Sequence, residues 1–157
     1  MKEAEDWLLL PAKLIAVLLV PTAFWDASLG CIFWLDRGSV FVRPFLGEQT
    51  AAVCEQLYLQ FYPLTLLDRL LGLLLIGCGI LALLAADHLF RGERPGIRQC
   101  LLVFFFGALL PGLRLVFSWF LAGTGMTQIE TLIIWALCFL PFLLSSVYLN
   151  AVKSLFR

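Results

Sequence analysis

The sequence predicts an all-α integral membrane protein, a single membrane domain of residues 1–157. We expect four transmembrane helices, both termini in the cytoplasm, and an amphipathic interfacial helix between the first and second spans. The chain is 62% hydrophobic and 14% charged, whereas soluble domains have roughly 45–50% apolar and roughly 25% charged residues. Several stretches approach the ~20 apolar residues that cross about 30 Å of hydrocarbon. Basic residues also concentrate on one side of these stretches.

The stretch of residues 64–90 is the clearest of the predicted spans. It has no charged residue between Leu70 and Ala86, and three arginines follow it, from Arg91 to Arg98. Because a helix rises about 1.5 Å per residue, this stretch is long enough to cross the membrane. Small residues recur along it and allow a neighbouring helix to approach closely. Cys78, Ala82 and Ala86 are spaced by four and form a small-residue stripe, with Gly72 and Gly79 nearby.

The other predicted spans are residues 7–25, 99–122 and 131–150. The first follows an acidic amino-terminal segment, and Asp26 marks its exit from the membrane. The third contains Pro111 near its middle. We expect a kink there, because proline removes one backbone hydrogen bond from a helix.

The connection between the first and second spans mixes aromatic with charged residues, which suits the headgroup region of a membrane. Within it, residues 48–62 have helical spacing, since Val53, Leu57 and Phe61 recur at every fourth position, with Cys54 and Tyr58 beside them. Glutamates and glutamines lie largely elsewhere around this helix. We therefore predict an amphipathic helix that lies on the membrane and turns into the second span at Pro63.

Basic residues near the ends of the spans set the orientation. Seven belong to the side with the two termini and the loop between the second and third spans, namely Lys2, Lys13, Arg91, Arg94, Arg98, Lys153 and Arg157. The other side has Arg37 and Arg43, with Arg69 at its margin. The positive-inside rule therefore places both termini in the cytoplasm. The net charge of zero gives no reason to expect nucleic acid as a partner.

Ionisable residues in or near the spans on the outer side are the candidate site residues. They are Asp26, Asp68, Arg69, Arg114 and Glu130. By the helical rise, Arg114 lies roughly 12 Å below the outer end of its span and Asp68 roughly 7 Å below the end of its own. The two side chains meet if these helices pack antiparallel. An arginine at such a depth costs about 3 kcal/mol and usually has a partner within the protein.

Two interpretations of this cluster remain open. In one, Asp68, Arg114 and Glu130 form an outward-facing polar pocket that binds a ligand, a lipid headgroup or a proton. In the other, which we favour, they form a structural ion pair that joins the second, third and fourth spans. Arg69 then extends toward the outer surface.

The chain has five cysteines. Cys31 and Cys54 fall on the outer side and are candidates for a disulfide in an oxidising compartment, although packing as free thiols is the favoured alternative. The sequence has no Cys-x-x-Cys pair, which argues against thiol redox catalysis. No metal-site spacing, nucleophile motif or phosphate-binding loop stands out. We therefore expect no metal, no cofactor and no enzymatic activity.

Several short stretches occur in an order found in one bacterial family. They are Trp-Leu-Leu-Leu-Pro at residues 7–11, Asp68 early in the second span, Leu-Phe-Arg-Gly-Glu-Arg-Pro at residues 89–95, and Trp135, Pro141-Phe142 and Ser146 in the fourth span. This pattern resembles the family called domain of unknown function 2569, small inner-membrane proteins with four predicted helices. The sequence departs from it at residues 147–150, where the family has a basic ending, and at Lys13. The resemblance implies a bacterial inner membrane and no particular activity.

The leading functional expectation is a non-enzymatic accessory or scaffolding protein. It would act through helix contacts with copies of itself or with other membrane-protein subunits, using the small-residue stripe and the aromatic outer connection. The alternative is a binder of a small ligand, lipid or ion, or a transport component, that uses Asp68, Arg114 and Glu130. Membrane lipids are expected partners in both cases.

Overall fold

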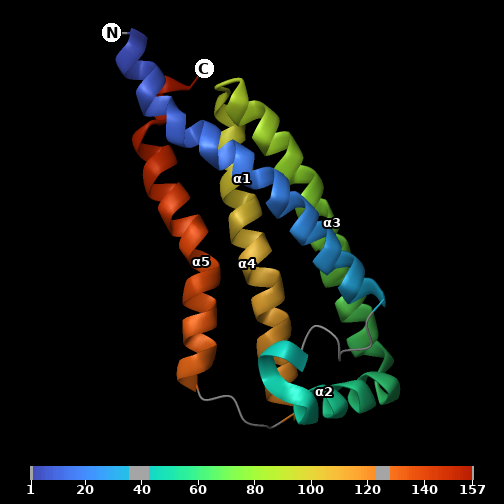
Figure 1. Ribbon diagram of the computed structural model, residues 1–157. Helices are drawn as coiled ribbons and strands as arrows, with labels where there is room; N and C mark the ends of the chain where they lie inside the picture. Colours follow the sequence, from blue (N-terminus) through green and yellow to red (C-terminus); the bar gives the residue numbers. More distant parts are fainter. Residues whose placement is uncertain (1, 36–42, 123–127, 157) are drawn as a thin grey trace.

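The computed structural model describes the backbone of residues 2–35, 43–122 and 128–156 (Figure 1). The described side chains are those of residues 10–35, 43–45, 47–120, 136, 139–154 and 156. These parts of the chain are helical throughout, with short turns between helices and no strand. The elements are α1 (Lys2–Leu35), α2 (Arg43–Gln60), α3 (Tyr62–Phe90), α4 (Arg94–Ala122), α5 (Gln128–Ala151) and the 3₁₀ helix η1 (Lys153–Leu155).

The long helices α1, α3, α4 and α5 make up the body of the structure, and α2 lies across one end of them (Figure 1). The start of α1, the α3–α4 turn and η1 gather at the opposite end, which we call the terminal end. The helices α1 and α4 run away from the terminal end, and α3 and α5 run toward it. As a result, α3 is antiparallel to α1 and α4, the two long helices on which it packs.

Three described stretches are long and apolar enough to cross a membrane. They are Leu10–Leu35 in α1, Tyr62–Phe90 in α3 and Arg94–Phe120 in α4. The fifth helix has 24 residues, and its described apolar part is Phe139–Ala151. An all-helical chain with three such helices has the form of a multi-pass membrane protein, because helices satisfy their backbone hydrogen bonds internally.

The first helix is longer than predicted, since α1 continues to Leu35 and does not end near Asp26. Pro21 lies inside the helix without ending it. The residues beyond it keep packing on α3 along one face, and this tertiary contact sustains the helix. Asp26 is compatible with the helix because its side chain points into the protein rather than marking an exit to water.

The helix α4 corresponds to the predicted third span. It also begins earlier than predicted, at Arg94 rather than residue 99. Pro95 stands in its first turn, where proline is well tolerated because the first backbone N–H groups of a helix lack partners anyway. Pro111 and Pro141 lie inside α4 and α5.

The helices α1 and α3 approach each other closely beside the small-residue stripe, at Gly72 and Gly79. A methyl group added to Gly72 would lie 2.6 Å from the carbonyl oxygen of Gly30, and one added to Gly79 would lie 2.7 Å from that of Ala23. Only glycine permits backbones to approach this closely. The stripe is therefore covered by α1 of the same chain, and it is not an exposed surface for another subunit.

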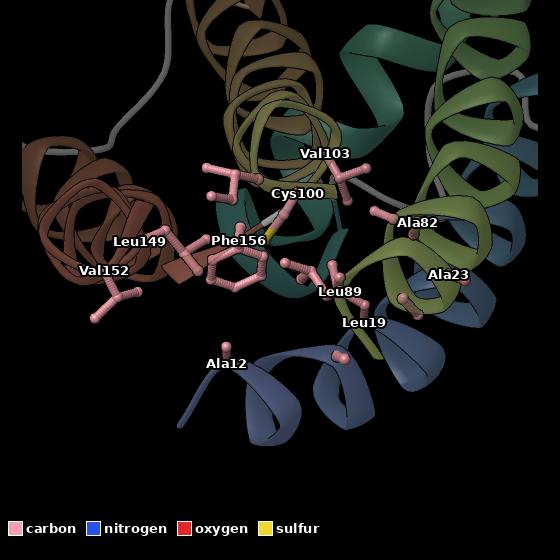
Figure 2. Packing of buried hydrophobic residues seen from close by; sticks show 14 residues of the cluster. Ala12, Leu19, Ala23, Ala82, Leu89, Cys100, Val103, Leu149, Val152 and Phe156 are labelled. Atoms are coloured by element: carbon pink, nitrogen blue, oxygen red, sulfur yellow. The ribbon is translucent and has the colours of Figure 1, made fainter. Parts of the chain in front are cut away.

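Buried apolar side chains form two clusters. The larger one lies toward the terminal end and joins α1, α3, α4 and α5, with Phe156 packed between them (Figure 2). The smaller one lies toward α2 and consists of Leu29, Phe33, Cys54, Leu75, Cys78, Leu110 and Leu115. Alanines supply much of α1's contribution to the larger cluster, which keeps the helices close.

The second helix differs from the predicted amphipathic helix of residues 48–62. It begins at Arg43 and has a break at Gly47, whose φ of 83° lies in the left-handed region that favours glycine. Its buried residues are Thr50, Ala51, Cys54 and Tyr58. Phe61, expected on the buried face, is exposed just after the helix ends. The packed face of α2 is thus centred on Cys54 and Tyr58 rather than on Val53, Leu57 and Phe61, because α2 rests on α3 and α4.

Candidate functional site

Asp68 in α3 and Arg114 in α4 form a doubly hydrogen-bonded ion pair inside the protein. Arg114 Nε donates to Asp68 Oδ1 at 2.8 Å, and Nη2 donates to Oδ2 at 2.6 Å. Each residue is 1% exposed. The antiparallel arrangement of α3 and α4 brings a residue near the start of one helix level with a residue near the end of the other.

Two aromatic residues enclose this ion pair. Tyr58 of α2 donates its hydroxyl hydrogen to Asp68 Oδ1 at 2.9 Å. The guanidinium carbon of Arg114 lies 4.7 Å from the ring centre of Phe33 and 5.7 Å from that of Tyr58. Such close aromatic rings attract the cation and exclude water from the pair. The geometry therefore favours a structural ion pair over an open ligand pocket.

Tyr58 acts as a hydrogen-bond donor in this cluster. Burial raises the pKa of its phenol above the usual range, and the nearby Asp68 carboxylate adds to the rise while Arg114 opposes it. The hydroxyl therefore stays protonated at physiological pH. This residue connects α2 to the buried ion pair of α3 and α4.

Of the other predicted site residues, Arg69 does not join this cluster. Arg69 is exposed, and its guanidinium carbon lies 5.8 Å from the ring centre of Trp34, a cation–π contact at the protein surface. Glu130 belongs to α5, but its side chain lies outside the described residues. Asp26, the remaining candidate, has a different environment.

Asp26 lies in the middle of the bundle, with only 2% of its surface exposed. Its carboxylate stands over Gly107, halfway along α4, and a methyl group added there would lie 3.1 Å from Asp26 Oδ2. Among the described residues, none forms a hydrogen bond to Oδ2. Since Gly107 and Arg114 are seven residues apart, Asp26 lies roughly 10 Å from the ion pair along the helix axis.

The Asp26 side chain borders a cavity of about 280 Å³. The cavity lies mainly between α1 and α4 and is bounded by α2 and α5 at its edges. Apart from Asp26 and Thr22, its walls are apolar or glycine. They are Trp25, Leu29, Phe45, Val103, Phe104, Gly107, Ala108, Pro111, Gly112, Leu115 and Pro141.

A larger groove of about 750 Å³ adjoins this cavity between α1, α4 and α5. The two share part of their walls, at Thr22, Trp25, Phe104 and Pro141. The remaining walls of the groove are almost entirely apolar, and consist of Pro11, Ile15, Leu18, Leu140, Leu144, Ser145, Tyr148 and Pro21. Cavity and groove are therefore neighbours, and the Asp26 carboxylate belongs to the wall of the cavity. We call the two together the Asp26 site.

The candidate disulfide is not formed, because Cys31 and Cys54 are both free thiols. Cys31 is exposed on α1, whereas Cys54 is buried beneath α4, with its Sγ 3.7 Å from the carbonyl oxygen of Ser118. Burial raises the pKa of the Cys54 thiol above its usual value. The packing of α2 on α4 thus turns Cys54 toward a partner other than Cys31.

Polar contacts also tie together the terminal end. Arg91 and Asp87 form an exposed ion pair of 2.9 Å within one helical turn. Arg94 Nε donates to the carbonyl oxygen of Phe156 at 3.0 Å, which holds the chain end against the start of α4. Arginines of the α3–α4 turn therefore have structural contacts in addition to any role in topology.

Comparison of the chain with family models, with curated proteins and with solved structures finds no match. The resemblance to the family called domain of unknown function 2569 therefore stays a prediction.

Sequence reasoning missed two features of these sites. Tyr58 was placed on an apolar face, and no local pattern indicates that it reaches Asp68 across the turn before α3. The separation of Asp26 from Asp68 was also missed, because it depends on the packing of α1 against α4. The one available signal was the pair Gly107 and Ala108, two small residues halfway along α4.

Proposed function

We propose that this protein is a non-enzymatic, multi-pass membrane protein that binds a lipid or a similarly apolar small molecule in the Asp26 site. The observation that carries the proposal is the apolar groove between α1, α4 and α5 together with its adjoining cavity. The groove has a volume of about 750 Å³, which falls in the range of about 300–1,000 Å³ typical of small-molecule sites. Its position along membrane-spanning stretches supports a ligand that enters from the bilayer.

The proposed topology has four spans, α1, α3, α4 and α5, with α2 at the outer membrane interface. The length of α5, 24 residues, supports the fourth span. The excess of basic residues at the terminal end supports a cytoplasmic location for both termini. The membrane we propose is a bacterial inner membrane, on the sequence resemblance.

The test is to purify the full chain in a mild detergent and to quantify the extracted small molecules per chain by mass spectrometry. The blocking variant is Leu18→Trp, because Leu18 lines the groove from α1 and is 59% exposed. The matched control is Leu14→Trp, since Leu14 is 56% exposed on the same helix and does not line the groove. We expect Leu18→Trp to lose a molecule that wild type and Leu14→Trp retain. Equal retention by all three would refute the proposal.

The accessory or scaffolding role is a second candidate, supported by exposed aromatic residues near the end that carries α2. Those with more than half of their surface exposed are Phe61, Tyr62 and Phe120. Aromatic residues at such a position also suit a membrane interface. A protein partner that co-purifies in stoichiometric amount and is lost in Phe120→Ser would favour this role. Purification of the chain without any such partner would count against it.

A further inference from the structure

We infer that Asp26 recognises a positively charged headgroup, so that the ligand of the Asp26 site is a long-chain amine. Its ammonium group would pair with the Asp26 carboxylate in the small cavity, and its hydrocarbon chain would lie in the groove. This inference rests on the proposed function, because it requires that the groove binds an apolar chain. It adds the chemical class of the ligand and the residue that selects it.

The burial and hydrogen bonding of the Asp26 carboxylate support the inference. It is buried halfway along the bundle, in a stretch that spans the membrane by length and composition. Oδ2 accepts no hydrogen bond from the described residues. Ionisable side chains inside a membrane generally pair with one another or mark a pathway or binding site. The described protein supplies Asp68 with such partners and leaves Oδ2 of Asp26 for a ligand.

The composition of the cavity around this carboxylate also supports the inference. Three aromatic residues line it, namely Trp25, Phe45 and Phe104. The face of an aromatic ring attracts a cation, and quaternary ammonium groups are commonly bound by aromatic walls. A carboxylate among aromatic rings therefore favours an ammonium group, and it disfavours a phosphate or a carboxylate headgroup by charge repulsion.

The shared walls of the cavity and the groove support the inference in a third way. Trp25 and Phe104 belong to the walls of both, so the chain of a molecule with its head beside Asp26 would reach the groove by passing these two side chains. The groove is lined at its far end by Pro11 and Tyr148. A headgroup in the small cavity and a flexible chain in the larger groove match an amphiphile with one polar end.

The test compares dodecylamine with dodecanol, which has the same chain and no charge. Both are titrated, as radiolabelled compounds, into the full chain in nanodiscs of zwitterionic lipid, with empty nanodiscs subtracted. We expect saturable binding of dodecylamine that is at least about tenfold tighter than that of dodecanol, because hydrogen bonds to a charged group are stronger than those between neutral groups. The variant Asp26→Asn should remove this preference. Asp87→Asn is the control, since it removes an exposed carboxylate near the terminal end.

The outcomes separate the inference from the proposed function. If both compounds bind saturably with equal affinity, or if Asp26→Asn keeps the preference for the amine, the groove is a chain-binding site and recognition by Asp26 is refuted. If neither compound binds saturably, the inference and the proposed function fail together. If the amine is preferred in wild type and Asp87→Asn but not in Asp26→Asn, the inference is supported.

A second measurement on wild type remains informative even if Asp26→Asn does not fold. Dicyclohexylcarbodiimide modifies carboxyl groups inside membranes, and mass spectrometry of peptides locates the modified residue. We expect dodecylamine to protect Asp26 from modification at least about tenfold better than dodecanol at equal concentration, in line with the expected difference in affinity. Equal protection by the two compounds, or none, would refute the inference.

Discussion

Two buried aspartates of this protein have opposite surroundings. Asp68 accepts hydrogen bonds from Arg114 and Tyr58 and is sealed by aromatic rings. Asp26 is equally buried, yet its Oδ2 accepts no hydrogen bond from the described residues, and the side chain borders an apolar cavity. Burial alone therefore does not identify the role of a carboxylate. The partners decide whether it holds the fold together or is available for a ligand.

The largest loss of stability is expected from removal of the cation of the ion pair. We expect Arg114→Leu to lower the free energy of unfolding by about 3–5 kcal/mol, because it leaves the Asp68 carboxylate buried without its cation. Unfolding with sodium dodecyl sulfate in mixed micelles, followed by circular dichroism, measures the loss. Arg69→Leu is the control, since it removes the adjacent, exposed arginine. An equal effect of both variants would contradict the structural role of the pair.

A smaller loss is expected from removal of the tyrosine hydroxyl. Tyr58→Phe deletes one hydrogen bond to the charged Asp68 and should lower the free energy of unfolding by about 1.5–3 kcal/mol. The same micelle titration measures it. Tyr62→Phe is the matched control, because Tyr62 is exposed at the start of α3. If Tyr58→Phe is as stable as this control, the hydrogen bond does not contribute to stability.

Glycines next to the two aspartates differ in the space around them, so alanine substitutions there should differ in their effect on stability. Gly72→Ala places a methyl group 2.6 Å from the backbone of α1 and should cost about 1–3 kcal/mol, because two helices must separate. In Gly107→Ala the methyl group meets only the end of the Asp26 side chain, which has a cavity beside it. We therefore expect a smaller loss, measured in the same titration. Gly77→Ala has no atom within 4 Å of the new methyl group and serves as the control.

The smallest effect on stability is expected at Asp26 itself. Asp26→Asn keeps the shape of the side chain and should change the free energy of unfolding of the unliganded protein by less than about 1 kcal/mol, since no hydrogen bond to Oδ2 is lost. Asp68→Asn, in contrast, should cost about 3–5 kcal/mol. Parallel titrations of the two variants compare them directly. A large loss in Asp26→Asn would show that this carboxylate stabilises the fold.

The sequence predicts the helices better than the sites. The apolar stretch before Arg91 is long enough to indicate α3 without further information. The contact between Asp68 and Arg114 could also be anticipated, because helical rise gives the depth of each residue and a short turn brings their helices together.

The remaining features depend on packing between residues far apart in the sequence. In the sequence, Asp26 has the position of a residue that ends a membrane span. In the structure its carboxylate is buried within a continuing helix, because Gly107 leaves space for it on α4. The free state of Cys54 depends in the same way on α4, because its thiol faces Ser118. Cysteine count and side of the membrane do not contain this information.

The position of the ion pair along the chain has a consequence for synthesis. Asp68 precedes Arg114 by 46 residues, so the ribosome delivers α3 to the translocon well before α4. During that interval the carboxylate lacks its guanidinium partner. The helix that carries it is the most apolar of the three candidate spans, which offsets a cost of about 3 kcal/mol for a charged residue during insertion. The leucines around Asp68 thus serve biogenesis, and Arg114 completes the assembly once both helices are in the bilayer.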